Sequence, residues 1–302
     1  MKFTIAIHGG AGNINPQNYT PEDIKVYEEK LKESLNAGFN ILQGGGNAID
    51  AVVASVKVME DSPLFNAGVG GVFANNAMVE LDACIMDGKT LNAGGVTSVH
   101  KIKNPIEGAL RVMEDSPHTL LSGNGAELFA YKQGLELVPN KHFHTKKRYD
   151  QFKKAQEKKK IMVDHSMGTV GAVAMDKKGN LAAATSTGGM TNKFYGRVSD
   201  TSIVGAGNYA NNKTCAISGT GTGDQFIKTV FAYDISAQME FASKTLEEAG
   251  KISLQKLAEI KGHGGFIGID RKGNIQMDFN CSGMFRGFKN ESENFVAIFK
   301  GD

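Results

Sequence analysis

The first sixty residues combine one short apolar run with two stretches of helical period. Residues 3–8 (FTIAIH) are largely apolar and lead into Gly-Gly, which is typical of a core strand that ends in a turn. Thr20 can cap a helix that begins at Pro21 and ends at glycines 44–46. Asn47 can cap a second helix, which is apolar nearly all round and is therefore expected to be buried.

The middle of the chain predicts two strands and two helices, followed by a region without periodicity. Residues 78–99 indicate two strands around an Asp-Gly turn, and helices are expected near 104–115 and 124–134. From about 135 to 168 the pattern disappears, and residues 141–160 hold nine Lys or Arg against two acidic residues. We interpret this region as an exposed, flexible basic linker.

Two hairpins of similar design lie far apart in the second half of the chain. Residues 169–189 and 264–280 each contain two strands around an Asp-x-Lys-Gly-Asn turn, and helical stretches at 222–250 and 253–260 lie between them. The strands are small or apolar, as expected for strands covered on both faces. This order predicts two sheets packed face to face and flanked by helices, in one domain interrupted by the linker. Two separate domains are the alternative.

Composition and charge narrow the class of protein. The 302 residues are 41% hydrophobic and 22% charged, which is typical of a globular protein with a large core. A net charge of +2 predicts no strong preference for polyanions or acidic membranes. Cys84, Cys215 and Cys281 have no metal-binding spacing and fit a reducing compartment. Since no apolar run suits a signal peptide or a membrane span, we expect a cytoplasmic protein.

The common sequence motifs of nucleotide-binding proteins and hydrolases are missing from the chain. It contains no Walker loop, no complete dinucleotide fingerprint, no G-x-S-x-G and no H-E-x-x-H. His142, His144 and His165 lie in the basic linker, which is a poor place for a rigid catalytic group. His8 follows a strand beside glycines, and we interpret it as a buried, hydrogen-bonded histidine and not as a base.

The junction between Gly168 and Thr169 suggests a different kind of nucleophile. A threonine hydroxyl is a weak nucleophile and needs an adjacent base, which the α-amine of an N-terminal threonine can supply. That amine has an ordinary pKa of ~7.7–8.0 and exists only after the preceding peptide bond is cut. Here a flexible segment would end directly before Thr169, and a core strand would begin at Val170. Gly168 permits the strained backbone that a self-cleaving bond requires.

Several long motifs in order resemble the plant-type asparaginase / isoaspartyl peptidase family of N-terminal-nucleophile hydrolases. They are HGGAG, GGGNAIDAV, FNAGVGGVF, ELDACIMDG, the stretch from GTVGAVAMDKKGN to VGAGNYANN, and TGTGDQFIK. The resemblance covers nearly the whole chain. It implies an α+β fold, a four-layer αββα sandwich in which helices flank two central, mainly antiparallel sheets.

The resemblance also implies maturation and assembly. Residues 1–302 would form one domain that cleaves itself between Gly168 and Thr169. The α subunit would be 1–168, carrying the flexible basic linker of about 135–168, and the β subunit would be 169–302. Two such αβ units would form a dimer. No cofactor is expected for catalysis, and no nucleic acid or membrane partner.

The implied activity is hydrolysis of the side-chain amide of L-asparagine and of β-aspartyl (isoaspartyl) dipeptides, which releases L-aspartate through an acyl-enzyme. By motif position, the resemblance implies these roles: Thr169 is the nucleophile, Thr187 hydrogen-bonds its hydroxyl, Arg197 and Asp200 hold the substrate's α-carboxylate and α-ammonium, Thr220 and Gly221 form the oxyanion hole, Gly223 binds the ammonium, and Asn66 lies nearby. It also implies a structural sodium ion on backbone carbonyls of Met59, Glu60, Asp61, Leu64, Phe65 and Ala67.

The chemistry of the residues agrees with these roles, although other interpretations stay open. A planar guanidinium suits a carboxylate and an aspartate suits an ammonium, and the three-residue separation of Arg197 and Asp200 lets both face one small zwitterion. The plainer interpretation is that they pair with each other on a surface loop. On the same fold, a glycosylasparaginase or a taspase-like endopeptidase is the alternative. Outside it, residues 141–160 could bind nucleic acid or an acidic partner, or the chain could be a precursor that never matures.

Overall fold

Two β-sheets form the centre of the computed structural model, which describes residues 2–158 and 168–301. The larger sheet contains β1 (Thr4–Gly12), β2 (Leu81–Asp87), β3 (Ala93–Val99), β4 (Leu120–Ser122), β5 (Val170–Met175), β6 (Leu181–Thr187), β11 (Gly283–Asn290) and β12 (Asn294–Phe299). The smaller contains β7 (Asn208–Ala210), β8 (Cys215–Gly221), β9 (Gly264–Asp270) and β10 (Ile275–Phe279). Their orders are β12-β11-β1-β5-β6-β2-β3-β4 and β10-β9-β8-β7. The named strands pair antiparallel, apart from the parallel pair β3–β4.

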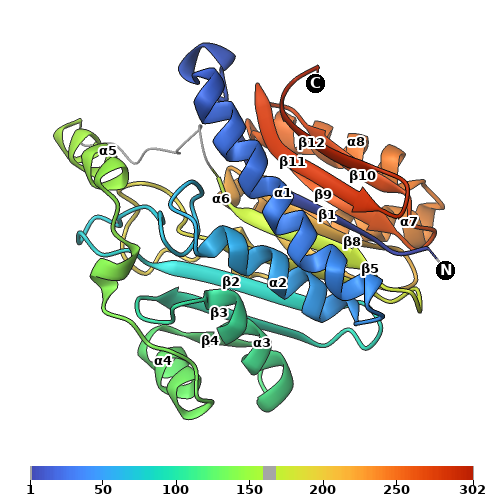
Figure 1. Cartoon of the computed structure of the whole chain (residues 1–302), viewed down its shortest axis with the longest axis horizontal. Helices are drawn as coiled ribbons and strands as arrows, with labels where there is room; N and C mark the ends of the chain where they lie inside the picture. Colours follow the sequence, from blue (N-terminus) through green and yellow to red (C-terminus); the bar gives the residue numbers. More distant parts are fainter. Residues whose placement is uncertain (1, 159–167, 302) are drawn as a thin grey trace.

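Helices cover the outer faces of both sheets. They are α1 (Pro21–Gln43), α2 (Ala48–Glu60), α3 (Pro105–Asp115), α4 (Gly123–Lys132), α5 (Lys146–Glu157), α6 (Gly223–Thr229), α7 (Phe231–Ala242) and α8 (Leu246–Glu259), with short 3-10 turns at Pro16–Asn18, Asn140–Phe143 and Asp200–Ser202. Helices α1, α2 and α3 lie on the larger sheet, and α7 and α8 lie on the smaller one (Figure 1). The expected αββα sandwich is therefore confirmed. Within the described ranges, no helix is both long and apolar enough to cross a bilayer.

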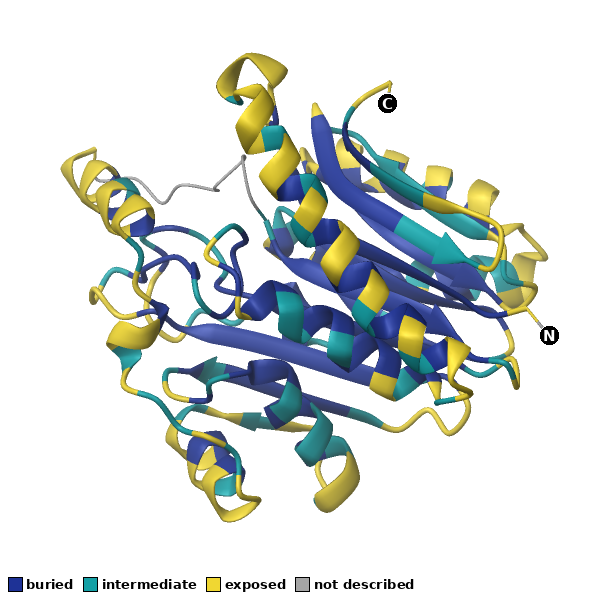
Figure 2. Ribbon diagram, viewed as in Figure 1, coloured by how far each residue is buried: buried dark blue, intermediate teal, exposed yellow. Residues whose placement is uncertain are grey.

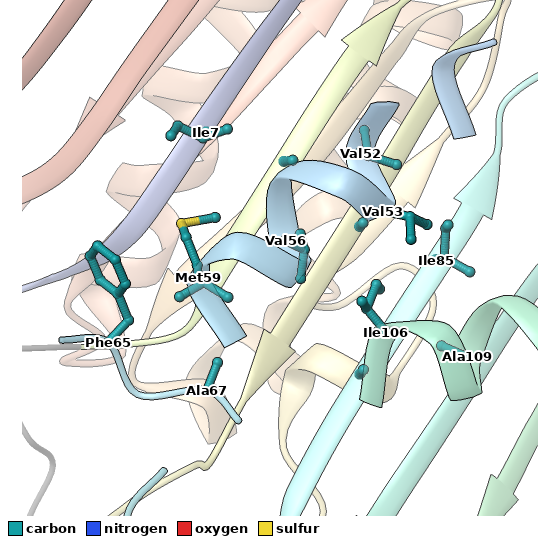
Figure 3. Close-up of a cluster of buried hydrophobic side chains, with 14 of the residues drawn as sticks. Ile7, Val52, Val53, Val56, Met59, Phe65, Ala67, Ile85, Ile106 and Ala109 are labelled. Carbon is teal, nitrogen blue, oxygen red and sulfur yellow. The ribbon is translucent and has the colours of Figure 1, made fainter. Parts of the chain in front are cut away.

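Three apolar layers hold the sandwich together. The first lies between α1–α3 and the larger sheet, where Val52, Val56 and Met59 of α2 lie among Ile7 and Ile106 (Figure 3). The second lies between the two sheets, and the third lies between the smaller sheet and α7 and α8. Figure 2 shows the result, with buried central strands and helices exposed on their outer sides. Strands β1 and β5 are buried along their whole length, which fits strands covered on both faces.

The helix starts follow the capping chemistry expected from the sequence. Thr20 Oγ1 accepts a hydrogen bond from Asp23 N (3.1 Å), and Thr20 N donates to the Asp23 carboxylate (2.9 Å), which completes a capping box. Asn47 Oδ1 accepts from Asp50 N (2.7 Å) at the start of α2. Both side chains satisfy amide groups that have no partner inside the helix.

The expected hairpins β2–β3, β5–β6 and β9–β10 are confirmed, but the sequence analysis did not predict β11 and β12. Strand β11 pairs with β1 and with the edge strand β12. As a result, β1 lies between β11 and β5, so strands from both ends of the chain form one sheet. Residue 169 immediately precedes β5, at the centre of this sheet.

The prediction of a flexible linker from about 135 is wrong for residues 135–158. This region contains the 3-10 turn Asn140–Phe143 and helix α5, which Thr145 caps. Phe152 is 2% exposed and stacks on Phe73 with ring centroids 5.6 Å apart, and the buried Arg148 donates from Nε to Gly70 O (2.7 Å). Two buried aromatic residues, Phe143 and Phe152, among many lysines leave almost no periodic signal. The remainder of the predicted linker, 159–167, lies outside the described residues.

Replacing Phe152 by alanine should detach α5. We expect a loss of about 3–4 kcal/mol in the free energy of unfolding of this region, because a buried aromatic side chain is removed. Tryptic cleavage within α5 under native conditions should accelerate correspondingly. Tyr131→Ala is the matched control, because Tyr131 of α4 is 66% exposed and its loss should cost within about 0.5 kcal/mol. Equal cleavage rates in the two variants would contradict this anchoring role.

Candidate active site

Thr169 stands at the head of the central strand β5 and is 7% exposed. Its Oγ1 donates to Thr187 Oγ1 (3.1 Å), and Thr187 Oγ1 also accepts from Gly189 N (3.0 Å). Thr187 is the last residue of β6, which pairs with β5 along its length. The two hydroxyls are therefore held together by the ends of two adjacent strands.

A buried histidine, His8, holds the backbone of Thr169 through a hydrogen bond to its carbonyl oxygen. His8 Nδ1 lies 3.0 Å from Thr169 O, and His8 Nε2 lies 2.8 Å from Ser218 Oγ. Burial lowers the pKa of His8 to about 3, so the ring is neutral. Because a carbonyl oxygen can only accept, Nδ1 carries the hydrogen and Nε2 accepts from Ser218. The expectation of a buried, hydrogen-bonded histidine is confirmed.

Two glycines and a threonine pack tightly around the bond between residues 168 and 169. Gly10 has φ +112°, and a Cβ atom there would lie 2.3 Å from Gly168 N. A Cβ atom on Gly168 would lie 2.7 Å from Thr220 Oγ1. Thr220 Oγ1 accepts from Ala11 N (3.2 Å). The backbone at Gly168 is thus confined between β1 and the end of β8, with no room for a side chain on either glycine.

Arg197 and Asp200 face the same pocket but are not paired with each other. Arg197 forms an ion pair with Asp224 (2.7 Å) instead. Within the described part of the chain, Arg197 Nε and Asp200 Oδ2 are buried and have no hydrogen-bond partner. A Cβ atom on Gly223 would lie 2.4 Å from Asp200 Oδ1 and 2.9 Å from Arg197 Nη2, so this glycine lets the backbone approach both side chains. The interpretation as a simple surface pair is wrong.

Burial also shifts the pKa of Asp200. The side chain is 3% exposed, and this burial raises its pKa to about 6, although Arg197 opposes the shift. A buried carboxylate oxygen and a buried guanidinium nitrogen that have no hydrogen-bond partner among the described residues are unfavourable, because burial also separates them from water. A small zwitterion with one carboxylate and one ammonium group would satisfy both.

The pocket brings together most of the residues that the sequence analysis singled out. It is lined by Ala11, Asn66, Gly168, Thr169, Thr187, Gly189, Met190, Arg197, Ser199, Asp200, Gly221 and Gly223. Thr220 lies behind this lining and is fully buried. Ala11, Gly189, Met190 and Ser199 had no predicted role. Ala11 belongs to the HGGAG motif, which contributed to the family resemblance without a role for this residue, and the other three lie on a loop whose path depends on tertiary contacts.

Asn66 lines the pocket and connects two of the loops around it. Its Nδ2 donates to Gly189 O (2.8 Å) and its Oδ1 accepts from Val72 N (3.1 Å), while its backbone oxygen accepts from Gly188 N (3.0 Å). With both side-chain groups engaged, Asn66 ties the loop after β6 to the loop after α2.

The segment expected to bind sodium comprises the last residues of α2 and the loop after it. The carbonyl of Glu60 accepts from Val69 N (2.7 Å) and that of Met59 from Ser62 N (3.3 Å), at the negative end of the helix. Hard oxygen donors of this kind suit a hard cation. The side chain of Glu60 points elsewhere: it accepts from Ser186 Oγ (2.6 Å) and Ile106 N (3.0 Å), and burial raises its pKa to about 8. Among the described residues, no cluster of three or more His, Cys, Asp or Glu forms a metal site.

Comparison with known proteins agrees with this geometry. The sequence model of a family described as asparaginase matches residues 1–298. The chain is 47% identical over 297 residues to an isoaspartyl peptidase of Escherichia coli (strain K12), covering 95% of this chain and 92% of that protein. It is 40% identical over 306 residues to an isoaspartyl peptidase/L-asparaginase of Danio rerio (100% and 97%). It is 38% identical over 323 residues to a probable isoaspartyl peptidase/L-asparaginase 2 of Arabidopsis thaliana (98% and 98%).

Substituting Gly10 tests the tight packing at Gly168. Gly45 is the matched control, since it also has positive φ (+86°) but a Cβ atom there would meet nothing within 4 Å. Gly45→Ala should lower the free energy of unfolding by about 1–2 kcal/mol, the strain of a left-handed alanine. Gly10→Ala should lower the free energy of unfolding by about 1–3 kcal/mol more than Gly45→Ala does, because the added methyl group overpacks against the backbone of Gly168. Urea unfolding of both variants measures the difference, and equal losses would contradict close contact at Gly168.

Proposed function

Because the chain belongs to the asparaginase family, we propose that it is an isoaspartyl peptidase / L-asparaginase that uses Thr169 as its nucleophile. The substrates are the side-chain amide of L-asparagine and β-aspartyl dipeptides, and the product is L-aspartate. One observation carries the assignment of the site: the Thr169 hydroxyl, held by Thr187, shares a pocket with unpaired buried atoms of Arg197 and Asp200. Both substrate classes contain the zwitterionic group that would complete this pair.

In the proposed complex, Arg197 binds the α-carboxylate and Asp200 binds the α-ammonium. The guanidinium Nε and the carboxylate Oδ2 then gain hydrogen-bond partners, which neither atom has among the described residues. The carbonyl of Gly223 accepts a further hydrogen bond from the ammonium, for which its close approach to Asp200 is suited. The scissile carbonyl then lies toward Thr169, one methylene group beyond the α-carbon.

The nucleophile must first acquire its base. In the intact chain, Thr169 N belongs to a peptide bond and cannot accept a proton. We propose that the Gly168–Thr169 bond is hydrolysed by the chain itself, which leaves 1–168 and 169–302 as α and β subunits of one domain. The confinement of Gly168 between Gly10 and Thr220 supports this step, because it holds the scissile bond against the future nucleophile.

In the mature enzyme, Thr169 Oγ1 attacks the side-chain carbonyl carbon of the substrate while its α-amine accepts the hydroxyl proton. Thr220 and Gly221 N–H are proposed to stabilise the oxyanion. Thr220 suits this role because its oxygen already accepts from Ala11 N, which leaves its own hydrogen to donate. The C–N bond breaks and the leaving amine takes the proton. The α-amine of Thr169 then deprotonates a water molecule, which hydrolyses the ester and releases L-aspartate.

Three parts of the proposal extend beyond the pocket. A structural sodium ion would be held by backbone carbonyls of Met59, Glu60, Asp61, Leu64, Phe65 and Ala67, at the C-terminal end of α2 and in the loop after it. Such an ion would stiffen the loop that carries Asn66. Assembly into a dimer of αβ units and a cytoplasmic location rest on the family resemblance and the cysteine usage described above.

Thr169→Ala should abolish both self-cleavage and hydrolysis, since the hydroxyl is removed. Intact-mass measurement should show one chain of full length for this variant. The wild-type protein should show two fragments that divide at Gly168–Thr169. Thr169→Ser, which keeps a hydroxyl, is the control and should still cleave. A Thr169→Ala protein that appears as two fragments, or a wild-type protein that turns over asparagine while uncut, would contradict the assignment.

Binding of L-aspartate should weaken in acid. Asp200 attracts the ammonium only when ionised, and its pKa is raised to about 6. Affinity should therefore fall as the pH drops through that value, by roughly tenfold between pH 7 and pH 5. Calorimetric titration measures it. In Asp224→Asn the midpoint should move to lower pH, because the Asp224 charge contributes to the raised pKa of Asp200. Binding that is independent of pH over this interval would contradict the role of Asp200.

A further inference from the structure

We propose that Glu80 and Asp82 are positioning residues for substrate recognition: each holds the backbone amide directly before one residue of the Arg197–Asp200 clamp. This inference rests on the function proposed above. It concerns residues that do not touch the substrate, and it assigns each of them to a different half of the zwitterion.

Asp82 holds the segment that carries Asp200. The Asp82 side chain is fully buried in β2. Its Oδ2 accepts from Ser199 N (2.9 Å), and Ser199 immediately precedes Asp200. Its Oδ1 accepts from Thr97 Oγ1 (2.7 Å) and Ser98 N (2.8 Å) on the neighbouring strand. A carboxylate anchored on one side by two donors therefore fixes the position of the Ser199 amide on the other.

Glu80 holds the segment that carries Arg197. Glu80 Oε2 accepts from Gly196 N (3.0 Å), and Gly196 immediately precedes Arg197. The carbonyl of Glu80 accepts from the buried ammonium of Lys193 (3.0 Å), which also donates to Gly188 O (2.9 Å). His100 Nε2 lies 3.4 Å from Glu80 Oε1. Glu80 thus binds the clamp loop at two points, through its side chain and its backbone.

Glu80 and Asp82 lie two residues apart, and this spacing explains why both can bind the loop. Residues two apart on an extended segment project to the same face, so Glu80 and Asp82 both project toward the loop. Residues 188–199 of that loop contain no helix or strand, and Gly196 has φ +77°. Hydrogen bonds to charged groups are stronger than neutral ones. The loop therefore takes its position from Asp82 in β2 and from Glu80, which lies directly before this strand.

This assignment makes a prediction that a purely structural role does not. Loss of the Asp82 carboxylate should disturb recognition of the ammonium, and loss of the Glu80 carboxylate should disturb recognition of the α-carboxylate. A general loosening of the fold would weaken every ligand alike. Three small inhibitors separate these cases: L-aspartate has both groups, succinate lacks the ammonium, and β-alanine lacks the α-carboxylate.

The experiment measures inhibition constants for these three compounds on mature wild-type enzyme, Asp82→Ala and Glu80→Ala, with cleavage checked by intact mass. Asp82→Ala should weaken the binding of L-aspartate and β-alanine by about tenfold or more, and it should leave the inhibition constant of succinate within about twofold of the wild-type value. Glu80→Ala should weaken the binding of L-aspartate and succinate to a similar extent and leave the binding of β-alanine unchanged. For the substrate, KM should rise more than kcat falls in both variants.

Asp87→Ala is the matched control. Asp87 ends the same strand, and its carboxylate accepts from Lys89 N (2.9 Å) and Thr90 Oγ1 (2.7 Å), away from the clamp. All three inhibitors should bind it as they bind the wild type. If an alanine variant does not fold, Asp82→Asn or Glu80→Gln carries the test. Each keeps one acceptor oxygen, so the same selectivity is expected at reduced size.

Equal weakening of all three compounds, no weakening, or any other pattern would overturn the inference. Failure of the proposed function would look different, because the wild-type enzyme itself would then neither hydrolyse asparagine nor bind L-aspartate.

Discussion

The hydrogen bond from His8 to the carbonyl of Thr169 is the contact on which the site depends. The same imidazole accepts from Ser218, so one side chain of β1 joins the larger sheet to the smaller one directly beneath Thr169. Burial keeps the ring neutral and leaves one possible arrangement of its hydrogens. The ends of β5, β6 and β8 therefore lie at fixed positions relative to one another, and hydrogen bonds from Gly189 N to Thr187 and from Ala11 N to Thr220 hold these two residues beside Thr169.

Next to this rigid centre, the clamp residues Arg197 and Asp200 have buried polar atoms without hydrogen-bond partners among the described residues. The carboxylate of Asp82 and the ammonium of Lys193 are buried and hydrogen-bonded, whereas Arg197 and Asp200 each keep an atom without a partner within the described residues. Unmade hydrogen bonds of buried groups are unfavourable until a ligand supplies them. The pocket is thus preorganised for a carboxylate and an ammonium at a fixed spacing, and burial of Asp200 raises its pKa.

The sequence predicted the elements whose structure depends on neighbouring residues. It did not predict the elements whose position depends on contacts with residues far away in the chain. The caps Thr20 and Asn47 and the paired hairpins predicted elements that the structure contains, because those signals lie within a few residues of each other. Helix α5 was missed, since its position depends mainly on Phe152 meeting Phe73, some eighty positions earlier. Strands β11 and β12 were missed as well, although β11 completes the sheet beside β1.

The sequence by itself determined the family and the candidate residues, because long motifs preserve both the identity and the order of side chains. It also determined the sandwich, since apolar runs and turns of fixed length allow few ways to cover both faces of a strand. Only the tertiary structure decided that Arg197 forms its ion pair with Asp224, and that Glu80 and Asp82 reach the amides before the clamp. These contacts join positions about 30 to 120 apart, and the direction of a side chain across such a distance follows from sheet packing and not from its neighbours in the chain.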